Sequence, residues 1–190
     1  IQRSPIQSEG LYFGNIVYQE VYDLIDVALK VRKKIPNFTI SVFADASSDD
    51  AARYLESIHS KNASNAVFLK NAVDFKTMIS LQKSAKVLLF PGKSWIRSNS
   101  GFPNKLGEYL ASGTPVVGAD VGGIHGILED GEQLYLCPPD DVEAFSGRVV
   151  ECLVDSENAR KVGQKGRSWA KKNLSNSSIS EDFIKWVGHD

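Results

Sequence analysis

Short apolar runs alternate with longer amphipathic stretches along most of the chain, and this alternation constrains the fold more than any other feature. A short apolar run bounded by turn residues is typical of a buried strand. Such runs predict strands over 11–14, 38–43, 66–69, 86–90 and 115–118. A further small unit, at 134–136, follows the last of these strands.

The stretches between these runs place apolar residues at helical spacing, as Leu24, Ile25 and Ala28 do in the first of them. They predict helices over 19–34, 49–60, 75–84, 104–112, 142–154, 157–172 and 179–187. Strands separated by helices of this length form right-handed crossovers and a parallel sheet covered on both faces. We therefore expect an α/β fold, a Rossmann-like doubly wound sheet.

The charge balance and the cysteines narrow the possible functions. The 22 basic and 23 acidic residues give a net charge of -1, which provides no overall attraction to nucleic acid or to anionic membranes. The two cysteines, Cys137 and Cys152, are too few for a disulfide framework and have no partners at metal-binding spacing. They favour a reducing compartment, so we expect a cytoplasmic protein without a metal site.

The longest loop, 91–103, leads directly into the helix predicted at 104–112. Free amide groups and the positive end of the helix dipole face such a loop, and a phosphate is a natural ligand there. Gly101 allows close backbone approach, while Lys93, Arg97 and Lys105 supply positive charge. An ordinary surface loop with solvated basic residues is the alternative.

Glu108 lies one turn inside the same helix, within reach of a ribose diol beside a bound phosphate. The alternative is an ion pair with Lys105, three residues earlier. The paired glycines Gly122 and Gly123 follow another strand and either expose amides to an anion or make a tight turn. Neither Gly101 nor the Gly122–Gly123 pair belongs to a sequence motif typical of dinucleotide-binding or P-loop proteins.

Four separate pieces of sequence, in this order and spacing, resemble the C-terminal half of group-one retaining glycosyltransferases with the GT-B fold. These pieces are Lys105–Val117, Gly122–Ile124, Asp130–Gly131 and Pro138–Asp140. The resemblance covers nearly the whole chain and implies one lobe of a GT-B architecture, the lobe that binds a nucleotide-diphosphate sugar. It also implies 1–10 as a linker, 11–175 as the domain, and a helix within 176–190 that packs toward an N-terminal acceptor lobe.

The resemblance assigns roles to several positions. Glu108 matches the second glutamate of the family's E-x7-E motif, which holds the nucleotide ribose. Gly14 matches the glycine that ends the first strand. The base pocket is expected at Leu69, Lys70 and Asn71, mostly through the backbone. Because that contact is made mostly by the backbone, the sequence leaves a UDP-, GDP- or ADP-sugar open as the donor, with no other cofactor.

The chain also departs from the family pattern around the donor sugar. Ser100 stands at the first motif glutamate, so Ser100 and the amides of Gly101 and Phe102 are expected to contact the donor differently. His125 and Gly126 stand at the familiar proline and glutamate of the glycine loop.

The basic pair that usually binds the diphosphate is also replaced. Asn15 stands where an arginine is common, and Gln19 and Glu20 stand where a lysine is common. Lys93, Arg97 or Lys105 is the hypothetical substitute for that pair.

The resemblance implies sugar transfer to a glycan, a lipid-linked glycan or a small molecule, with retention and without a metal. Catalytic residues are not assigned, because the acceptor lobe is not in these residues. The partners implied are the nucleotide-sugar donor and the acceptor lobe of the same polypeptide. Any membrane contact would be peripheral, at the inner face of the membrane, and made only through the acceptor lobe. Two alternatives stay open: a degenerate lobe that serves as a binding or regulatory module, and a sugar-nucleotide epimerase lobe.

Overall fold

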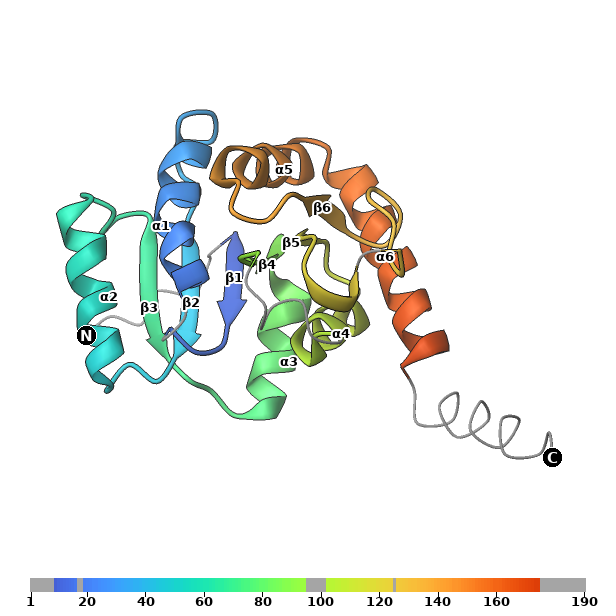
Figure 1. Ribbon diagram of the computed structural model, residues 1–190, viewed down its shortest axis with the longest axis horizontal. Helices are drawn as coiled ribbons and strands as arrows, with labels where there is room; N and C mark the ends of the chain where they lie inside the picture. The colour runs from blue at the N-terminus through green and yellow to red at the C-terminus, as the bar shows by residue number, and fades with distance from the viewer. Residues whose placement is uncertain (1–8, 17–18, 95–101, 125, 175–190) are drawn as a thin grey trace.

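The computed structural model describes residues 9–16, 19–94, 102–124 and 126–174. Its centre is one parallel sheet of six strands in the order β3-β2-β1-β4-β5-β6 (Figure 1). The strands are β1 Gly10–Phe13, β2 Ile40–Ala44, β3 Val67–Asn71, β4 Val87–Phe90, β5 Val116–Ala119 and β6 Tyr135–Cys137. The order reverses between β1 and β4, which is the switch point of a doubly wound sheet.

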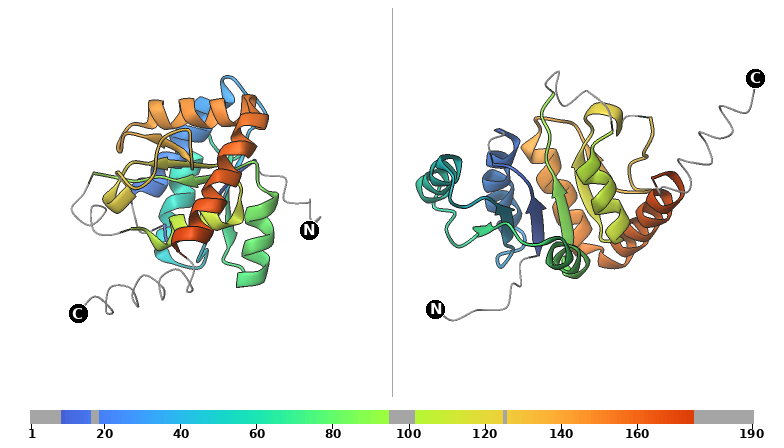
Figure 2. Two further views of the ribbon diagram at one scale, coloured as in Figure 1. Left: turned by 90° about the vertical axis from the view of Figure 1, so that its right-hand side faces the viewer. Right: turned by 90° about the horizontal axis from the view of Figure 1, so that it is seen from below.

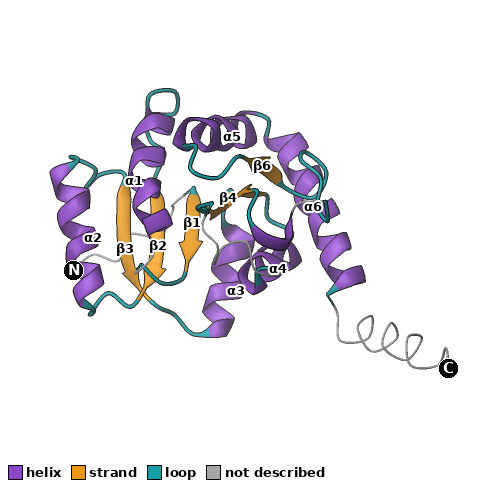
Figure 3. Ribbon diagram, in the orientation of Figure 1, coloured by secondary structure: helices purple, strands orange, loops and turns teal. Residues whose placement is uncertain are grey.

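Six α-helices connect and cover these strands in the described part of the chain (Figure 3). They are α1 Gln19–Arg32, α2 Asp49–Ser60, α3 Phe75–Ser84, α4 Asn104–Ser112, α5 Val142–Val154 and α6 Ser156–Asn173, with a 3-10 turn, η1, at Gly122–Ile124. One buried cluster joins α1, α2 and α5 to one face of the sheet, and a second joins α3 and α4 to the other. Figure 2 shows these two helical layers from the side and from below.

Side-chain caps explain where several of the helices begin. Ser48 accepts a hydrogen bond from the Ala51 amide at 3.2 Å and so caps α2. Asp74, Asp141 and Asp155 cap α3, α5 and α6 in the same way. A capping side chain satisfies an amide that has no partner inside the helix, which fixes these starts locally in the sequence.

The expected Rossmann-like doubly wound α/β fold is confirmed, and the predicted helices and strands that fall in the described ranges lie within a few residues of the observed ones. The main difference is β6, which the sequence marks only as a small unit at 134–136. Its three residues pair with Val117–Ala119 and complete the sheet at the β5 edge. Most of the expected linker 1–10 and the expected helix within 176–190 lie outside the described residues.

Both cysteines are buried free thiols. Burial raises the pKa of Cys137 and the pKa of Cys152 to about 12, so neither thiol ionises near neutral pH. In the described ranges, no helix combines the length and the apolar character needed to cross a membrane.

Candidate functional site

The carboxyl edge of the sheet brings together loops that are far apart in the sequence. Gly14 follows β1, Phe102 precedes α4, and the Gly122–Gly123 turn follows β5. Since β1, β4 and β5 are neighbours in the sheet, these loops converge at the switch point (Figure 1). A cleft at this place is where doubly wound sheets bind their ligands.

Lys105 lies directly over the end of β1. Its ammonium occupies the space that a side chain at residue 14 would fill, since a Cβ added to Gly14 would collide with Lys105 Nζ. Gly14 has a φ of 148°, which a residue with a side chain rarely adopts. The ammonium also donates to Tyr12 Oη at 3.3 Å and sits 4.5 Å from the centre of the Tyr12 ring. Gly14 is therefore a glycine both for its backbone angle and for the lysine above it.

Burial lowers the pKa of Lys105 to about 8, although the nearby carboxylates of Glu20 and Glu108 act in the opposite direction. The lysine is thus charged at neutral pH but incompletely compensated. An anion placed beside it would replace the lost hydration with a direct charge interaction.

The same helix contributes backbone donors to this place. Pro103 is the N-cap of α4 and has no side chain that could accept from the first amides. A helix end without a capping side chain carries free N–H groups and the positive end of the helix dipole. Lys105 and the start of α4 therefore present positive charge together.

Glu108 lies three residues after Lys105 on α4 and lines a cavity that Lys105 does not line. This cavity, of about 620 Å³, lies between α4 and α6, and the Glu108 side chain is exposed. Phe102 lines the same cavity and stacks on Trp169 with ring centres 5.6 Å apart. Although Glu108 and Lys105 both lie within the described ranges, they form no ion pair with each other.

The expected base-pocket residues end β3, at the opposite side of the switch point from β5. Asn71 pairs in register with Ala44 of β2, and Lys70 and Asn71 are exposed. Lys70 Nζ lies 5.6 Å from the centre of the Phe68 ring. The structure thus leaves these positions open at the carboxyl edge, two strands away from β1.

Lys93 lies in a network of carboxylates. Its ammonium is 2.6 Å from Asp23 Oδ2 of α1 and 3.3 Å from Asp140 Oδ1 in the β6–α5 turn. Lys93 thus forms ion pairs with two carboxylates, whereas Lys105 forms none with any described residue. Arg97, Ser100, Gly101 and His125 lie outside the described residues.

Two residues around Lys105 complete its surroundings: Tyr12, which the sequence did not single out, and Glu20, which the sequence marked only as standing where a lysine is common. Tyr12 supplies the ring and the hydroxyl under the ammonium, and Glu20 supplies negative charge from the first turn of α1. Tyr12 looks like an ordinary apolar residue of the predicted strand 11–14, and nothing in its spacing indicates a contact with Lys105. Glu20 was noted as a departure from the family pattern, but its closeness to Lys105 depends on how α1 and α4 pack.

Tyr109 anchors the end of β1 beneath Gly14. Its fully buried hydroxyl accepts from the Phe13 amide at 2.8 Å, across 96 residues of sequence. Burial raises the pKa of Tyr109, so the hydroxyl stays neutral and keeps its proton. The contact ties α4 to β1 one residue before Gly14.

We expect Tyr109→Phe to lower the free energy of unfolding by about 1–2 kcal/mol, because it leaves the buried Phe13 amide without this acceptor. Tyr135→Phe is the matched control, since the Tyr135 hydroxyl meets the solvent-facing Asn158 amide at 3.3 Å. That variant should change stability by less than about 0.5 kcal/mol. Urea unfolding of both variants measures the difference. Equal losses would contradict a special role for the Tyr109 contact.

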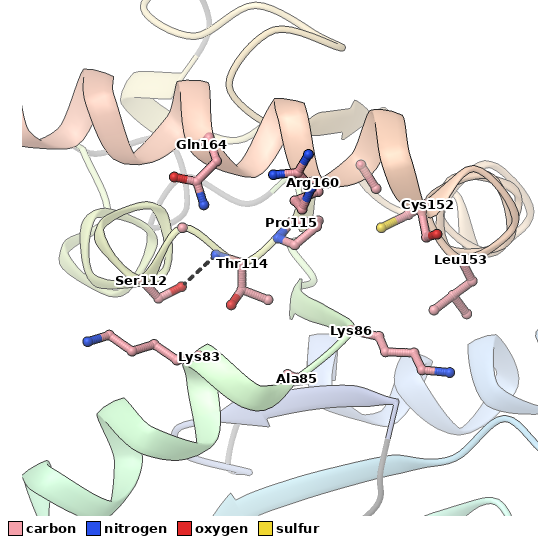
Figure 4. Close-up of a pocket in the computed structure, with 13 residues that line it drawn as sticks. Lys83, Ala85, Lys86, Ser112, Thr114, Pro115, Cys152, Leu153, Arg160 and Gln164 are labelled. Atoms are coloured by element: carbon pink, nitrogen blue, oxygen red, sulfur yellow. Dashed lines mark hydrogen bonds between the residues drawn. The ribbon is translucent and has the colours of Figure 1, made fainter.

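A second cavity, of about 330 Å³, lies at the opposite edge of the sheet (Figure 4). Ala85 and Lys86 line it just before β4, and Thr114 and Pro115 line it just before β5. Figure 4 shows the side chains of Lys83 and Lys86 pointing in opposite directions, and Lys86 is paired with Glu9 at 2.6 Å. The two lysines of this cavity therefore do not point toward one place. The cavity also lies at the amino ends of β4 and β5, opposite the carboxyl edge.

Within the described residues, no group of three or more His, Cys, Asp or Glu side chains is arranged to hold a metal ion.

Comparison with known proteins defines the family. A sequence model described as glycosyl transferases group 1 matches residues 8–155. The chain belongs to the group 1 glycosyltransferase family. Its sheet and helices form the Rossmann-like half of the GT-B fold, as in the glycosyltransferases that it resembles in structure.

The relatives are distant in sequence. An uncharacterized glycosyltransferase of Methanocaldococcus jannaschii is 23% identical over 163 residues, which cover 86% of this chain and 43% of that protein. TarM of S. aureus has a TM-score of 0.76 at 19% identity, over 97% of this chain and 37% of that one.

The C-terminal domain of a group 1 glycosyltransferase, LpcC of Francisella tularensis, has a TM-score of 0.72 at 17% identity. The match covers 88% of this chain and 86% of that domain. By contrast, this chain spans less than half the length of the curated relatives that it matches. The described fold thus corresponds to one domain of such proteins.

Proposed function

We propose that this chain is the donor-binding lobe of a retaining glycosyltransferase that uses a UDP-, GDP- or ADP-sugar without a metal ion. The observation that carries this proposal is the Lys105 ammonium over Gly14, beside the uncapped start of α4. A largely buried, incompletely compensated cation beside the start of a helix that no described side chain caps is suited to a diphosphate. An acceptor lobe of the same polypeptide would supply the acceptor site, for a glycan, a lipid-linked glycan or a small molecule.

The order of strands supports one direction for the nucleotide. Lys105 and the Gly122–Gly123 turn would hold the diphosphate and the donor sugar near β1, β4 and β5. The base would lie toward Leu69, Lys70 and Asn71 at the end of β3. Glu108, exposed on α4, would accept hydrogen bonds from the ribose hydroxyls.

The chemistry that this arrangement favours is departure of the nucleoside diphosphate. As the bond between the anomeric carbon and the diphosphate oxygen breaks, negative charge grows on the leaving group. The Lys105 ammonium and the α4 amides would be prepositioned where that charge develops, so they would stabilise the transition state more than the ground state.

Two of the structural neighbours agree with a UDP-sugar as one of the candidate donors. TarM has been crystallised with UDP, and the pneumococcal O-GlcNAc transferase GtfA with UDP and GlcNAc.

Calorimetric titration with UDP, GDP and ADP tests the proposal. We expect one of the three to bind saturably, and Glu108→Gln to weaken that binding about tenfold, because a ribose acceptor with full charge is lost. Glu56→Gln, an exposed glutamate of α2, is the matched control and should leave Kd unchanged. Absence of saturable binding to all three nucleotides would overturn the proposal.

A degenerate lobe that binds a partner without turnover is the second candidate. The observation that favours it is Glu20, a carboxylate close enough to Lys105 to influence its charge. Turnover of a nucleotide sugar by the full-length protein, lost in a Glu108→Gln variant, would eliminate it.

A further inference from the structure

Asp140 adopts a backbone conformation that favours glycine. Its φ is 61°, and Asn62 is the other non-glycine residue with positive φ in the described ranges. Such a conformation is disfavoured for residues with a side chain and persists where the surroundings fix it. Asp140 is also exposed, so burial does not hold it in place. Aspartate is one of the few residues that tolerate this conformation, and its polar contacts hold it there.

Those contacts bind three consecutive residues after β4. Asp140 Oδ2 accepts from the Ser94 amide at 3.0 Å and from Ser94 Oγ at 2.6 Å. Asp140 Oδ1 lies 3.3 Å from Lys93 Nζ, and the Asp140 amide donates to the Gly92 carbonyl at 3.4 Å. Lys93 in turn reaches Asp23 of α1 at 2.6 Å. We call Asp23, Lys93, Ser94 and Asp140 the Asp140 latch.

The start of the β4–α4 loop, which the latch contacts, packs against the loop that follows β5. A Cβ added at Gly92 would lie 2.9 Å from Val121 Cγ2 and 3.2 Å from Ala119 Cβ. Val121 immediately precedes the Gly122–Gly123 turn, and the neighbouring Asp120 amide donates to the Cys137 carbonyl at 2.8 Å. Gly92 thus packs against the two residues, Ala119 and Val121, that lie just before that turn.

We propose that Asp140 is a positioning residue for the donor diphosphate, which acts by holding Gly92–Ser94 against the loop that carries Gly122 and Gly123. The proposal rests on the proposed donor-binding function. It also assigns Lys93 to the latch, where two carboxylates satisfy its charge, and leaves Lys105 as the described cation that faces the diphosphate.

The test uses Asp140→Gly, because glycine keeps the positive φ and removes the carboxylate. We expect the Ser94 amide to exchange with solvent roughly tenfold faster, since its acceptor is gone. The Kd for the nucleoside diphosphate that binds the wild-type chain should rise about fivefold or more, as for the loss of precise positioning. Asp140→Asn keeps an acceptor for Ser94 and should restore most of the affinity.

Asp141→Ala is the matched control at the adjacent position. Asp141 caps α5 by accepting from the Ala144 amide at 2.8 Å, so this variant should lower the melting temperature. It should leave Ser94 exchange and Kd unchanged, which separates a loss of stability from a loss of positioning.

Three results would count against the proposal, each in a different way. Unchanged Ser94 exchange in Asp140→Gly would show that the latch does not hold the loop. Faster exchange with an unchanged Kd would show that the latch is structural only. A wild-type chain that binds no nucleotide would refute the donor-binding function and with it the positioning role, while the exchange data would still report on the latch.

Discussion

Lys105→Met is expected to have opposite effects on binding and on stability. The Kd for a nucleoside diphosphate should rise roughly tenfold or more, because a charge-assisted contact to phosphate contributes about 1.5–3 kcal/mol. The free energy of unfolding at pH 7 should increase by about 1–3 kcal/mol, because a largely buried ammonium is replaced by an apolar side chain of similar length. Titration calorimetry and urea unfolding measure the two effects.

The pH dependence follows from the pKa of Lys105, which burial lowers from 10.5 to about 8. Below pH 8 the ammonium is charged in both the folded and the unfolded chain, so the fold carries the whole desolvation cost. Between pH 8 and 10.5 the folded chain loses the proton first, so stability should rise, by up to about 3 kcal/mol. Lys105→Met should lack this rise.

Nucleotide affinity should change in the other direction over the same range. As pH rises above 8, Lys105 in the nucleotide-free chain loses its charge, so the affinity of the wild-type chain for a diphosphate should fall. The affinity of Lys105→Met should not change over this range. Lys83→Met, at the opposite edge of the sheet, is the matched control and should follow the wild type in both measurements. A destabilised Lys105→Met variant with unchanged affinity would contradict the role given to this lysine.

Gly163→Ala is expected to lower the free energy of unfolding by about 2–3 kcal/mol. A Cβ at this position of α6 would lie 2.5 Å from the Gly113 carbonyl oxygen and 3.0 Å from the Pro115 nitrogen. Both are backbone atoms, so the clash is relieved only by moving α6 away from the end of α4. Urea unfolding measures the loss.

Gly147→Ala is the matched control, because Gly147 lies in α5 with nothing within 4 Å of an added Cβ. Alanine is the better helix former, so this variant should be more stable by about 0.5–1 kcal/mol. Similar effects of the two substitutions, of either sign, would show that the close approach of α6 to α4 does not limit the packing.

Most of the fold could be predicted because the patterns that define it are local. The alternation of buried runs and amphipathic stretches places α1 to α6 and β1 to β5 within a few residues. The three-residue β6 shows no such pattern, since its pairing with Val117–Ala119 comes from the neighbouring strand. Local sequence patterns thus predict the helices and the longer strands, but they do not predict a three-residue strand at the edge of the sheet.

The candidate site could be predicted only as a set of loops. Strand order predicts the carboxyl edge, and the family resemblance predicts roles there for Gly14 and Glu108. The difference between Lys93 and Lys105 does not, because it depends on Asp23, Asp140 and Tyr12, which come from other elements.

The sequence by itself determined the parallel doubly wound architecture and which loops lie at the carboxyl edge of the sheet, because helical and strand periodicity and turn residues act over short distances. The tertiary structure decided which lysine lies over Gly14, which carboxylates hold the other, and which glycine of two helices is packed against backbone. These outcomes depend on the directions of side chains and on the approach of helices that are distant in the sequence. No spacing within a single segment encodes such contacts.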